Sequence, residues 1–251
     1  MYRSISTHAI VIRRERLGEL HKSLSLLTAD LGLISATAYG ACRMNSRLRM
    51  GSEPFTWSLA RLYHNPVKHA YKVTDLEIRD SFEGLQQEVS RLAAASLWAE
   101  VVQKSYGAGE FSGSLFRLFV EALRLLSKSG PRQEPYVTVQ FLWRFLSMAG
   151  YQPDTGVCDR CGASLSAARA VVYVPSGHTF LCAACGAGQG TTIPAGCLRY
   201  LEASQALPIS SAVDIALEDA SLAALRSALP RIVQSVLEGE LVSLRLAGSS
   251  R

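Results

Sequence analysis

Four cysteines in the second half of the chain have the types and spacing best suited to chemistry. Cys158 and Cys161 stand in one C-x-x-C-G turn, Cys182 and Cys185 stand in another, and 20 residues separate the two turns. Such a turn places two sulfurs on one side of a tight bend, and the glycine leaves room for backbone amides to reach them. The spacing predicts a zinc ion held by four thiolates. Its role would be structural, because a catalytic zinc keeps one position open to water.

The alternatives for these cysteines are two unmetallated thiol pairs or a redox dithiol. Six cysteines are too few for a disulfide scaffold in a chain that can build its own core, so the pattern favours a reducing cytoplasm. Cys42 and Cys197 stand alone and are expected to be small buried side chains. His178 lies near the second turn, but four thiolates already complete the predicted tetrahedron.

The excess positive charge of the chain lies near its N terminus. The chain carries 26 basic and 21 acidic residues, a net charge of +5. Residues 1–80 hold 12 basic and 7 acidic residues, whereas residues 81–251 hold 14 of each. This asymmetry indicates a module that faces a polyanion, joined to a neutral remainder. The candidate phosphate-binding residues are Arg13, Arg14, Arg16, Arg43, Arg47, Arg49, Lys68 and Lys72.

Aromatic residues interleave with these basic residues, as on surfaces that stack bases while neutralising the phosphate backbone. They are Tyr39, Phe55, Trp57, Tyr63 and Tyr71. By strand parity Phe55, Trp57 and Tyr63 share one face with Leu59, and the pattern favours that face as barrel core. Lys22 is expected to be an ordinary surface lysine.

The elements that must position these residues change type near residue 80. Before it, β-branched and aromatic residues alternate in short runs divided by turn signals. Five strands in about 75 residues suit a small closed barrel, because closure removes exposed edges. The expected strands are Ile5–Arg14, Lys22–Thr28, Leu33–Tyr39, Pro54–Tyr63 and Lys68–Ile78.

After Asp80 the apolar residues recur with a helical period. Helices are expected over Phe82–Lys104, around Leu115–Leu126 and over Tyr136–Met148. A last apolar stripe runs from Leu222 to Val236, where Pro230 should kink or split the helix. The expected domains are a barrel at 1–80, a helical domain at 81–153 and 191–251, and a zinc module at 154–190.

Other functional signatures are missing from the sequence. It contains no phosphate-loop, nucleophile-elbow or H-E-x-x-H motif, and its five histidines form no metal or triad grouping. An enzyme is therefore not supported. Residues 1–18 carry charges where a signal peptide needs an apolar stretch, and no window reaches the roughly 18 uncharged apolar residues of a membrane span. We expect no targeting segment and no membrane partner.

One stretch next to the cysteines carries a family resemblance. Phe141–Asp154, with the sequence FLWRFLSMAGYQPD, runs directly into the first cysteine turn. Together with Gly18-Glu19, Leu24–Thr28 and Gly32 near the N terminus, it resembles the RecO family of bacterial recombination mediators. The resemblance covers roughly residues 5–190.

The resemblance implies an α+β multidomain protein. Its N-terminal antiparallel barrel would be an OB-fold, followed by an α-helical domain with the four-cysteine zinc module inserted. It also implies a protein of the bacterial cytoplasm and nucleoid that binds single- and double-stranded DNA and anneals complementary strands. With RecR it would load RecA onto DNA coated by single-stranded DNA-binding protein. The residues alone leave two alternatives open: a zinc-stabilised protein-interaction or assembly factor that binds no nucleic acid, and an enzyme with a dispersed active site.

Overall fold

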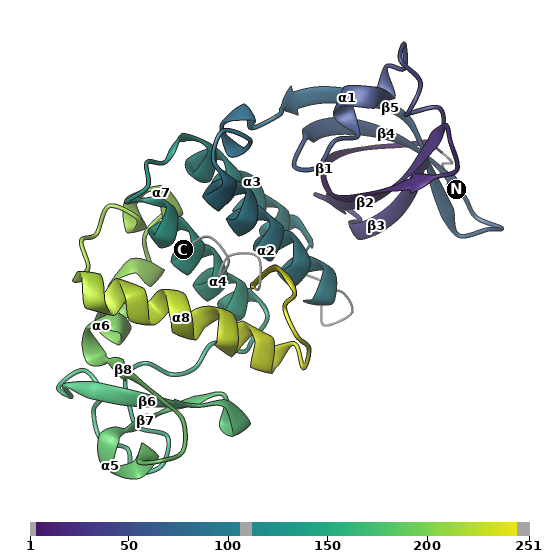
Figure 1. The fold of residues 1–251 in the computed structure, drawn as a ribbon. Helices are drawn as coiled ribbons and strands as arrows, with labels where there is room; N and C mark the ends of the chain where they lie inside the picture. The colour runs from purple at the N-terminus through teal and green to yellow at the C-terminus, as the bar shows by residue number, and fades with distance from the viewer. Residues whose placement is uncertain (1–3, 106–111, 245–251) are drawn as a thin grey trace. The chain divides into compact units, whose positions relative to one another are not determined.

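A computed structural model describes residues 4–105 and 112–244 (Figure 1). The chain divides into two compact units, Met1–Ser127 and Lys128–Arg251. The first unit contains the strands expected before residue 80 and also the two helices that follow them. The finer domain boundaries expected at 80, 153 and 190 stay a prediction.

Five strands of the first unit close into a barrel in the order β1-β2-β3-β5-β4 (Figure 1). β3 and β5 pair in parallel and the other neighbours pair antiparallel. The OB-like barrel and the α+β fold class are confirmed, and the expected strand ends differ from the observed ones by three residues or fewer. The elements are β1 (Ser4–Leu17), β2 (His21–Thr28), β3 (Gly32–Ala38), α1 (Leu48–Gly51), β4 (Trp57–Asn65) and β5 (Ala70–Asp80).

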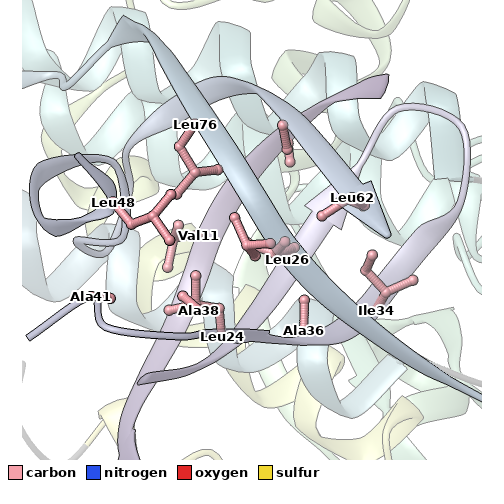
Figure 2. Packing of buried hydrophobic residues seen from close by; sticks show 13 residues of the cluster. Val11, Leu24, Leu26, Ile34, Ala36, Ala38, Ala41, Leu48, Leu62 and Leu76 are labelled. Carbon is pink, nitrogen blue, oxygen red and sulfur yellow. The ribbon is translucent and has the colours of Figure 1, made fainter. Parts of the chain in front are cut away.

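The barrel interior is filled by aliphatic side chains from every strand. Leu24 and Leu26 of β2 are fully buried, and Leu48 of α1 joins them at one end of the barrel. Figure 2 shows these side chains converging between the strands. The alternation of inward and outward residues along each strand produces this core. Its other labelled members are Val11, Ile34, Ala36, Ala38, Ala41, Leu62 and Leu76.

The inward face of β4 is not the one expected. Ser58, Ala60 and Leu62 are almost fully buried inside the barrel, whereas Trp57 and Tyr63 lie on the other face and are half-buried. The interior of a five-stranded barrel is narrow, so small side chains fit there and large rings do not. Phe55, which has a φ of 64°, precedes the strand and is buried separately.

Two helices complete the first unit, after a 3-10 turn at Glu83–Leu85. They are α2 (Val89–Ser105) and α3 (Ser112–Lys128), and the expected helix over 82–104 is shortened by that turn. The rings of Trp98 and Phe119 meet edge to face with centroids 6.4 Å apart. A Cβ at Gly84 would lie 1.9 Å from the carbonyl oxygen of Ser127, so only glycine fits at this approach.

The second unit is built on helices that pack through a buried polar network. The Gln140 amide of α4 donates to the hydroxyls of Tyr200 (3.0 Å) and Ser204 (2.8 Å) on α6. α8 packs on α4 and continues through Pro230, so the helix is not split there. The helices are α4 (Glu134–Met148), α6 (Ala195–Gln205), α7 (Ile209–Ala212) and α8 (Asp219–Val236).

A small sheet with the order β7-β6-β8 lies at one end of the second unit, together with the short helix α5 (Figure 1). β6 and β7 form a hairpin, and β8 pairs with the other edge of β6. Its strands are β6 (Ala170–Val174), β7 (Thr179–Cys182) and β8 (Thr191–Pro194), with α5 at Ala183–Gly186. Among the described residues, none of the helices has the length and apolar character needed to cross a membrane.

Candidate functional site

Four sulfur atoms come together beside the small sheet. The Sγ atoms of Cys158, Cys161, Cys182 and Cys185 all lie within 4.8 Å of one another. The two cysteine turns, 20 residues apart in the sequence, are therefore joined in space as expected. A set of four thiols at this separation could hold a metal ion.

The first cysteine turn is closed by backbone hydrogen bonds. The Gly162 amide donates to the carbonyl oxygen of Cys158 at 2.8 Å, and the Cys158 amide donates to that of Ala163 at 2.8 Å. Gly162 has a φ of 69°, a left-handed conformation that favours glycine. The turn therefore directs Cys158 and Cys161 to the same side for a local reason that the sequence already contains.

The second cysteine turn is held by the sheet. Cys182 ends β7 opposite Val171 of β6, and Cys185 follows within α5. A Cβ at Gly186 would lie 2.5 Å from the Cβ of Val172, so glycine lets α5 sit directly against β6. The β6–β7 hairpin thus carries the second pair of thiols back to the first pair.

Arg160 links the two cysteine turns through hydrogen bonds. Its guanidinium donates to the carbonyl oxygen of Cys185 at 2.7 Å and to the side-chain oxygen of Gln189 at 2.8 Å. Gln189 in turn donates to the same Cys185 carbonyl at 3.1 Å. One side chain of the first turn therefore fixes the backbone of the second turn.

Two of the four thiols, those of Cys158 and Cys185, have pKa values shifted in opposite directions. Burial raises the pKa of Cys158, but hydrogen bonds from the backbone of Cys182, Cys161 and Arg160 outweigh it and lower that pKa to about 6. Hydrogen bonds with the Cys182 and Cys161 side chains raise the pKa of Cys185 to about 12. The thiolate of Cys158 therefore forms easily, and the thiolate of Cys185 does not. A bound divalent cation favours ionisation of all four thiols.

The remaining cysteines and His178 lie outside this cluster. Cys197 is fully buried, as expected, and burial raises its pKa to about 11. Cys42 is half-buried, and its thiol lies 3.5 Å from the carbonyl oxygen of His21. His178 contacts Tyr173 and Ser235 through its Nδ1 atom, at 3.3 and 3.4 Å, and takes no part in the cluster.

A β-bulge in β1 determines which face of the strand Arg14 and Arg16 occupy. The register of β1 against β2 shifts between Val11 and Arg13, so that Arg13 faces Ser25 and Arg14 faces Leu24. Directly opposed residues share a face, and Leu24 belongs to the core. Simple alternation from Val11 would give Arg13 the inward face. The bulge instead gives that face to Arg14 and Arg16.

Lys22 is not a surface lysine, which corrects the expectation. Its side chain is 6% exposed, and its Nζ donates to Ser52 Oγ (2.7 Å), Glu53 Oε1 (2.9 Å) and the Arg49 carbonyl oxygen (3.3 Å). The other oxygen of Glu53 accepts from Arg14 Nε at 3.0 Å. The sequence did hold a signal, because Lys22 has the same parity along β2 as the core residues Leu24 and Leu26.

The other predicted basic residues are exposed. Arg13 pairs with Glu15 at 2.7 Å, and both side chains are more than half exposed. Arg43, Arg47, Arg49 and Lys68 are exposed as well. Within the described residues, none of these last four forms an ion pair through its side chain. The predicted residues therefore form two groups. Arg14 and Arg16 lie at the end of the barrel where β1 faces Lys22 of β2, and the others are exposed on loops, on α1 or on outer strand faces.

An exposed aromatic ring lies among these charges. Tyr39 is 52% exposed, and the Lys72 ammonium lies over its ring, 5.4 Å from the centroid. The ring of His21 meets Tyr39 edge to face at 5.0 Å. Trp57, by contrast, is covered by the Arg124 guanidinium of α3 at 4.8 Å. Of the predicted aromatics, Tyr39 is thus the exposed ring that a base could stack on, with a cation beside it that could neutralise an adjoining phosphate.

Comparisons with known proteins cover both units. The model described as recombination protein O N terminal matches residues 1–82, and the one described as recombination protein O C terminal matches residues 86–245. DNA repair protein RecO of Rubrobacter xylanophilus is 30% identical over 238 residues, which are 94% of this chain and 90% of the relative.

Two further relatives match over shorter stretches. DNA repair protein RecO of Heliobacterium modesticaldum is 36% identical over 155 residues, 61% of this chain and 54% of the relative. That of Alkaliphilus metalliredigens is 30% identical over 162 residues, 64% of this chain and 65% of the relative. The chain thus spans between half and two thirds of the length of these two relatives. With both halves matched by their models, the chain belongs to the recombination protein O family of DNA repair proteins.

Proposed function

We propose that this protein is a non-enzymatic mediator of DNA repair and homologous recombination. It binds single- and double-stranded DNA through the barrel and anneals complementary strands. Together with RecR it helps to load RecA onto DNA coated by single-stranded DNA-binding protein, at the nucleoid of the bacterial cytoplasm. Membership of the recombination protein O family supports this proposal, and the barrel offers a surface for it.

The unneutralised charge of the barrel is the observation that carries the proposal. Six of the eight predicted residues make no ion pair through their side chains within the described residues. Cations that form no ion pair within the protein are available to phosphates, and the adjoining Tyr39 ring is available to a base. The six residues are Arg16, Arg43, Arg47, Arg49, Lys68 and Lys72.

Annealing follows from charge alone in this proposal. Two single strands repel one another through their phosphates, and a surface that neutralises both lets them approach and pair. No nucleotide hydrolysis is needed, because base pairing supplies the free energy. The protein acts as a platform rather than as a catalyst with a nucleophile or a general base.

The metal of the four-cysteine cluster is zinc in this proposal, with a structural role. Zinc bound by sulfurs at about 2.3 Å places neighbouring sulfurs about 3.8 Å apart in a tetrahedron. The sulfurs of Cys161 and Cys182 are 3.8 Å apart. Four thiolates close the coordination sphere, so the ion would join the two cysteine turns and supply no open position for a reaction.

A salt titration tests the electrostatic basis of the function. If six cations each contact a phosphate of a single strand, the logarithm of affinity falls with the logarithm of salt with a slope of about −4. Affinity for an oligothymidine then drops about 300-fold between 50 and 200 mM salt, as measured by fluorescence anisotropy. An affinity that stays flat over this range would overturn the electrostatic account of binding. Absence of binding at every salt concentration would instead favour a factor that binds no nucleic acid.

Charge reversal tests where the DNA lies. Arg43→Glu combined with Arg47→Glu should weaken DNA binding by at least about tenfold at 100 mM salt, since two attractive contacts become repulsive. The matched control is Arg226→Glu with Arg231→Glu, two exposed residues of α8 in the second unit. Equal losses in the two double variants would show an effect of net charge, and the site would not be on the barrel.

A further inference from the structure

A cavity of about 280 Å³ opens at the end of the barrel that α1 covers. Its wall comes from four separate segments: the end of β1, the start of β2, the loop after β3, and α1 with the residues after it. Parts of the chain far apart in sequence thus line one hollow that is open to solvent. The lining residues used below are Arg14, Arg16, Lys22, Arg49 and Glu53.

Positive charge dominates the cavity wall. Four of these residues are cations and one is a carboxylate, which leaves three positive charges in excess. Both oxygens of Glu53 are engaged, one by Lys22 at 2.9 Å and the other by Arg14 at 3.0 Å. The carboxylate is therefore held by the wall, and the guanidinium groups of Arg16 and Arg49 make no ion pair within the described residues. The cavity is suited to an anion.

Hydrogen bonds hold the floor of the cavity in place. An ammonium has three N–H donors, and Lys22 directs one to each of Ser52, Glu53 and the Arg49 carbonyl. Lys22 therefore supplies positive potential without a free hydrogen bond. Ser52 Oγ in turn donates to the Arg49 carbonyl at 2.9 Å, which ties α1 to the same point. The hydrogen bonds to a ligand come from the arginines, whose planar forks match phosphate oxygens.

We propose that this cavity binds a phosphate monoester dianion. A backbone phosphodiester carries one negative charge, and its strand must enter and leave the site on both sides. A monoester carries about −1.5 to −2 at neutral pH and presents three free oxygens. A concave wall with three excess positive charges complements a phosphate monoester better than a backbone phosphodiester. The ligand is either the terminal phosphate of a DNA strand or free phosphate. The proposal that it is a strand end rests on the proposed function.

The first experiment is independent of DNA binding. Thermal unfolding of the full chain is compared in inorganic phosphate and in chloride of equal ionic strength. At phosphate about a hundredfold above its Kd, the unfolding temperature should rise by roughly 5 °C. The rise should be lost in Arg16→Gln and in Arg49→Gln, whose exposed side chains can be changed without opening the core. Arg79→Gln, at an exposed barrel position outside the cavity, should keep it.

The second experiment separates the two sources. Oligothymidines with a 5′-phosphate, a 3′-phosphate or neither are bound to the full chain, with a preference of about tenfold expected for one phosphorylated end. Arg49→Gln should abolish that preference and Arg79→Gln should not. If inorganic phosphate stabilises the protein and the three oligonucleotides bind with equal affinity, the ligand is free phosphate. The site would be overturned if phosphate did not stabilise the protein and the three oligonucleotides bound with equal affinity. If none of the three oligonucleotides bound, the proposed function would be overturned, and thermal unfolding in phosphate alone would decide whether the cavity binds phosphate.

Discussion

The four-cysteine cluster and the basic cavity are assembled in different ways. The cluster uses two short turns of five residues, each ended by a glycine with a structural reason. The first turn is closed by its own backbone, and the second is held by the adjacent β6–β7 hairpin. The cavity uses residues from four segments, and its cations converge because of a bulge in β1 and the placement of α1. Local spacing is therefore enough to predict the first site, whereas the second depends on how the whole barrel pairs.

The two sites also differ in what holds them. In the proposed function a metal ion joins the four thiols, and it would favour ionisation of Cys185, whose pKa is raised without it. The cavity is held by the protein itself, through the contacts of the buried Lys22 with Ser52 and Glu53. Removing one interaction should therefore have different consequences at the two sites.

The largest effect is expected from Cys158→Ser. It removes one of four thiolates from the cluster, and structural zinc contributes about 10–16 kcal/mol of apparent binding free energy in small zinc modules. We expect loss of bound zinc and proteolytic cleavage within residues 158–190 while the barrel stays folded. Metal analysis and limited proteolysis measure the two changes.

Cys197→Ala is the matched control for that variant, because Cys197 is a buried cysteine in the same unit but outside the cluster. It should keep one zinc per chain and lose only the stability expected for a small change in the core. Retention of equimolar zinc by the Cys158 variant would refute the ligand role of that thiol.

An intermediate effect is expected from Glu53→Gln at the basic cavity. It leaves the buried ammonium of Lys22 without its anionic partner. Removing one member of a buried ion pair costs about 3–5 kcal/mol, and we expect about 2 kcal/mol here because Glu53 is 36% exposed. Urea unfolding of the barrel measures the loss of free energy of unfolding.

Two controls define that result. Glu77→Gln breaks an exposed barrel pair with Arg79 of similar length, 2.9 Å, and should cost no more than about 1 kcal/mol. Lys22→Met added to Glu53→Gln removes the stranded charge and should recover part of the lost stability. If Glu53→Gln costs no more than Glu77→Gln, Lys22 does not hold the cavity floor.

Much of the architecture was predictable from sequence, and what was missed has a common cause. The five strands of the barrel, the helices α3, α4 and α8 and the cysteine cluster follow from periodicity and spacing, whereas α6, α7 and β8 were not predicted. The bulge after Val11, the inward Lys22 and the inward face of β4 were missed. Each of these three features depends on pairing with another strand or on the width of the barrel. Neither can be predicted from the residue pattern of a single strand.

The smallest effect is expected at Tyr39, an exposed residue whose role was suggested by pattern alone. Tyr39→Ala should weaken binding of single-stranded DNA by about fivefold, at the lower end of base-stacking contributions. The effect is modest because Lys72 and His21 already contact parts of the ring. Tyr39→Phe should bind as the unchanged protein does, because the phenyl ring retains a stacking face. Fluorescence anisotropy with matched single- and double-stranded DNA measures each variant.

The comparison of the two DNA forms decides what Tyr39 does. Bases of a duplex are already stacked on one another, so a stacking contact contributes to single-strand binding and little to duplex binding. A loss confined to single strands would therefore place an unpaired base on the ring. An equal loss on both forms would mean that the ring acts by positioning the Lys72 ammonium, 5.4 Å above it, against a phosphate. In that case Lys72→Gln would reproduce the loss, and the exposed face of the barrel would recognise DNA by charge, as we propose for the cavity at its end.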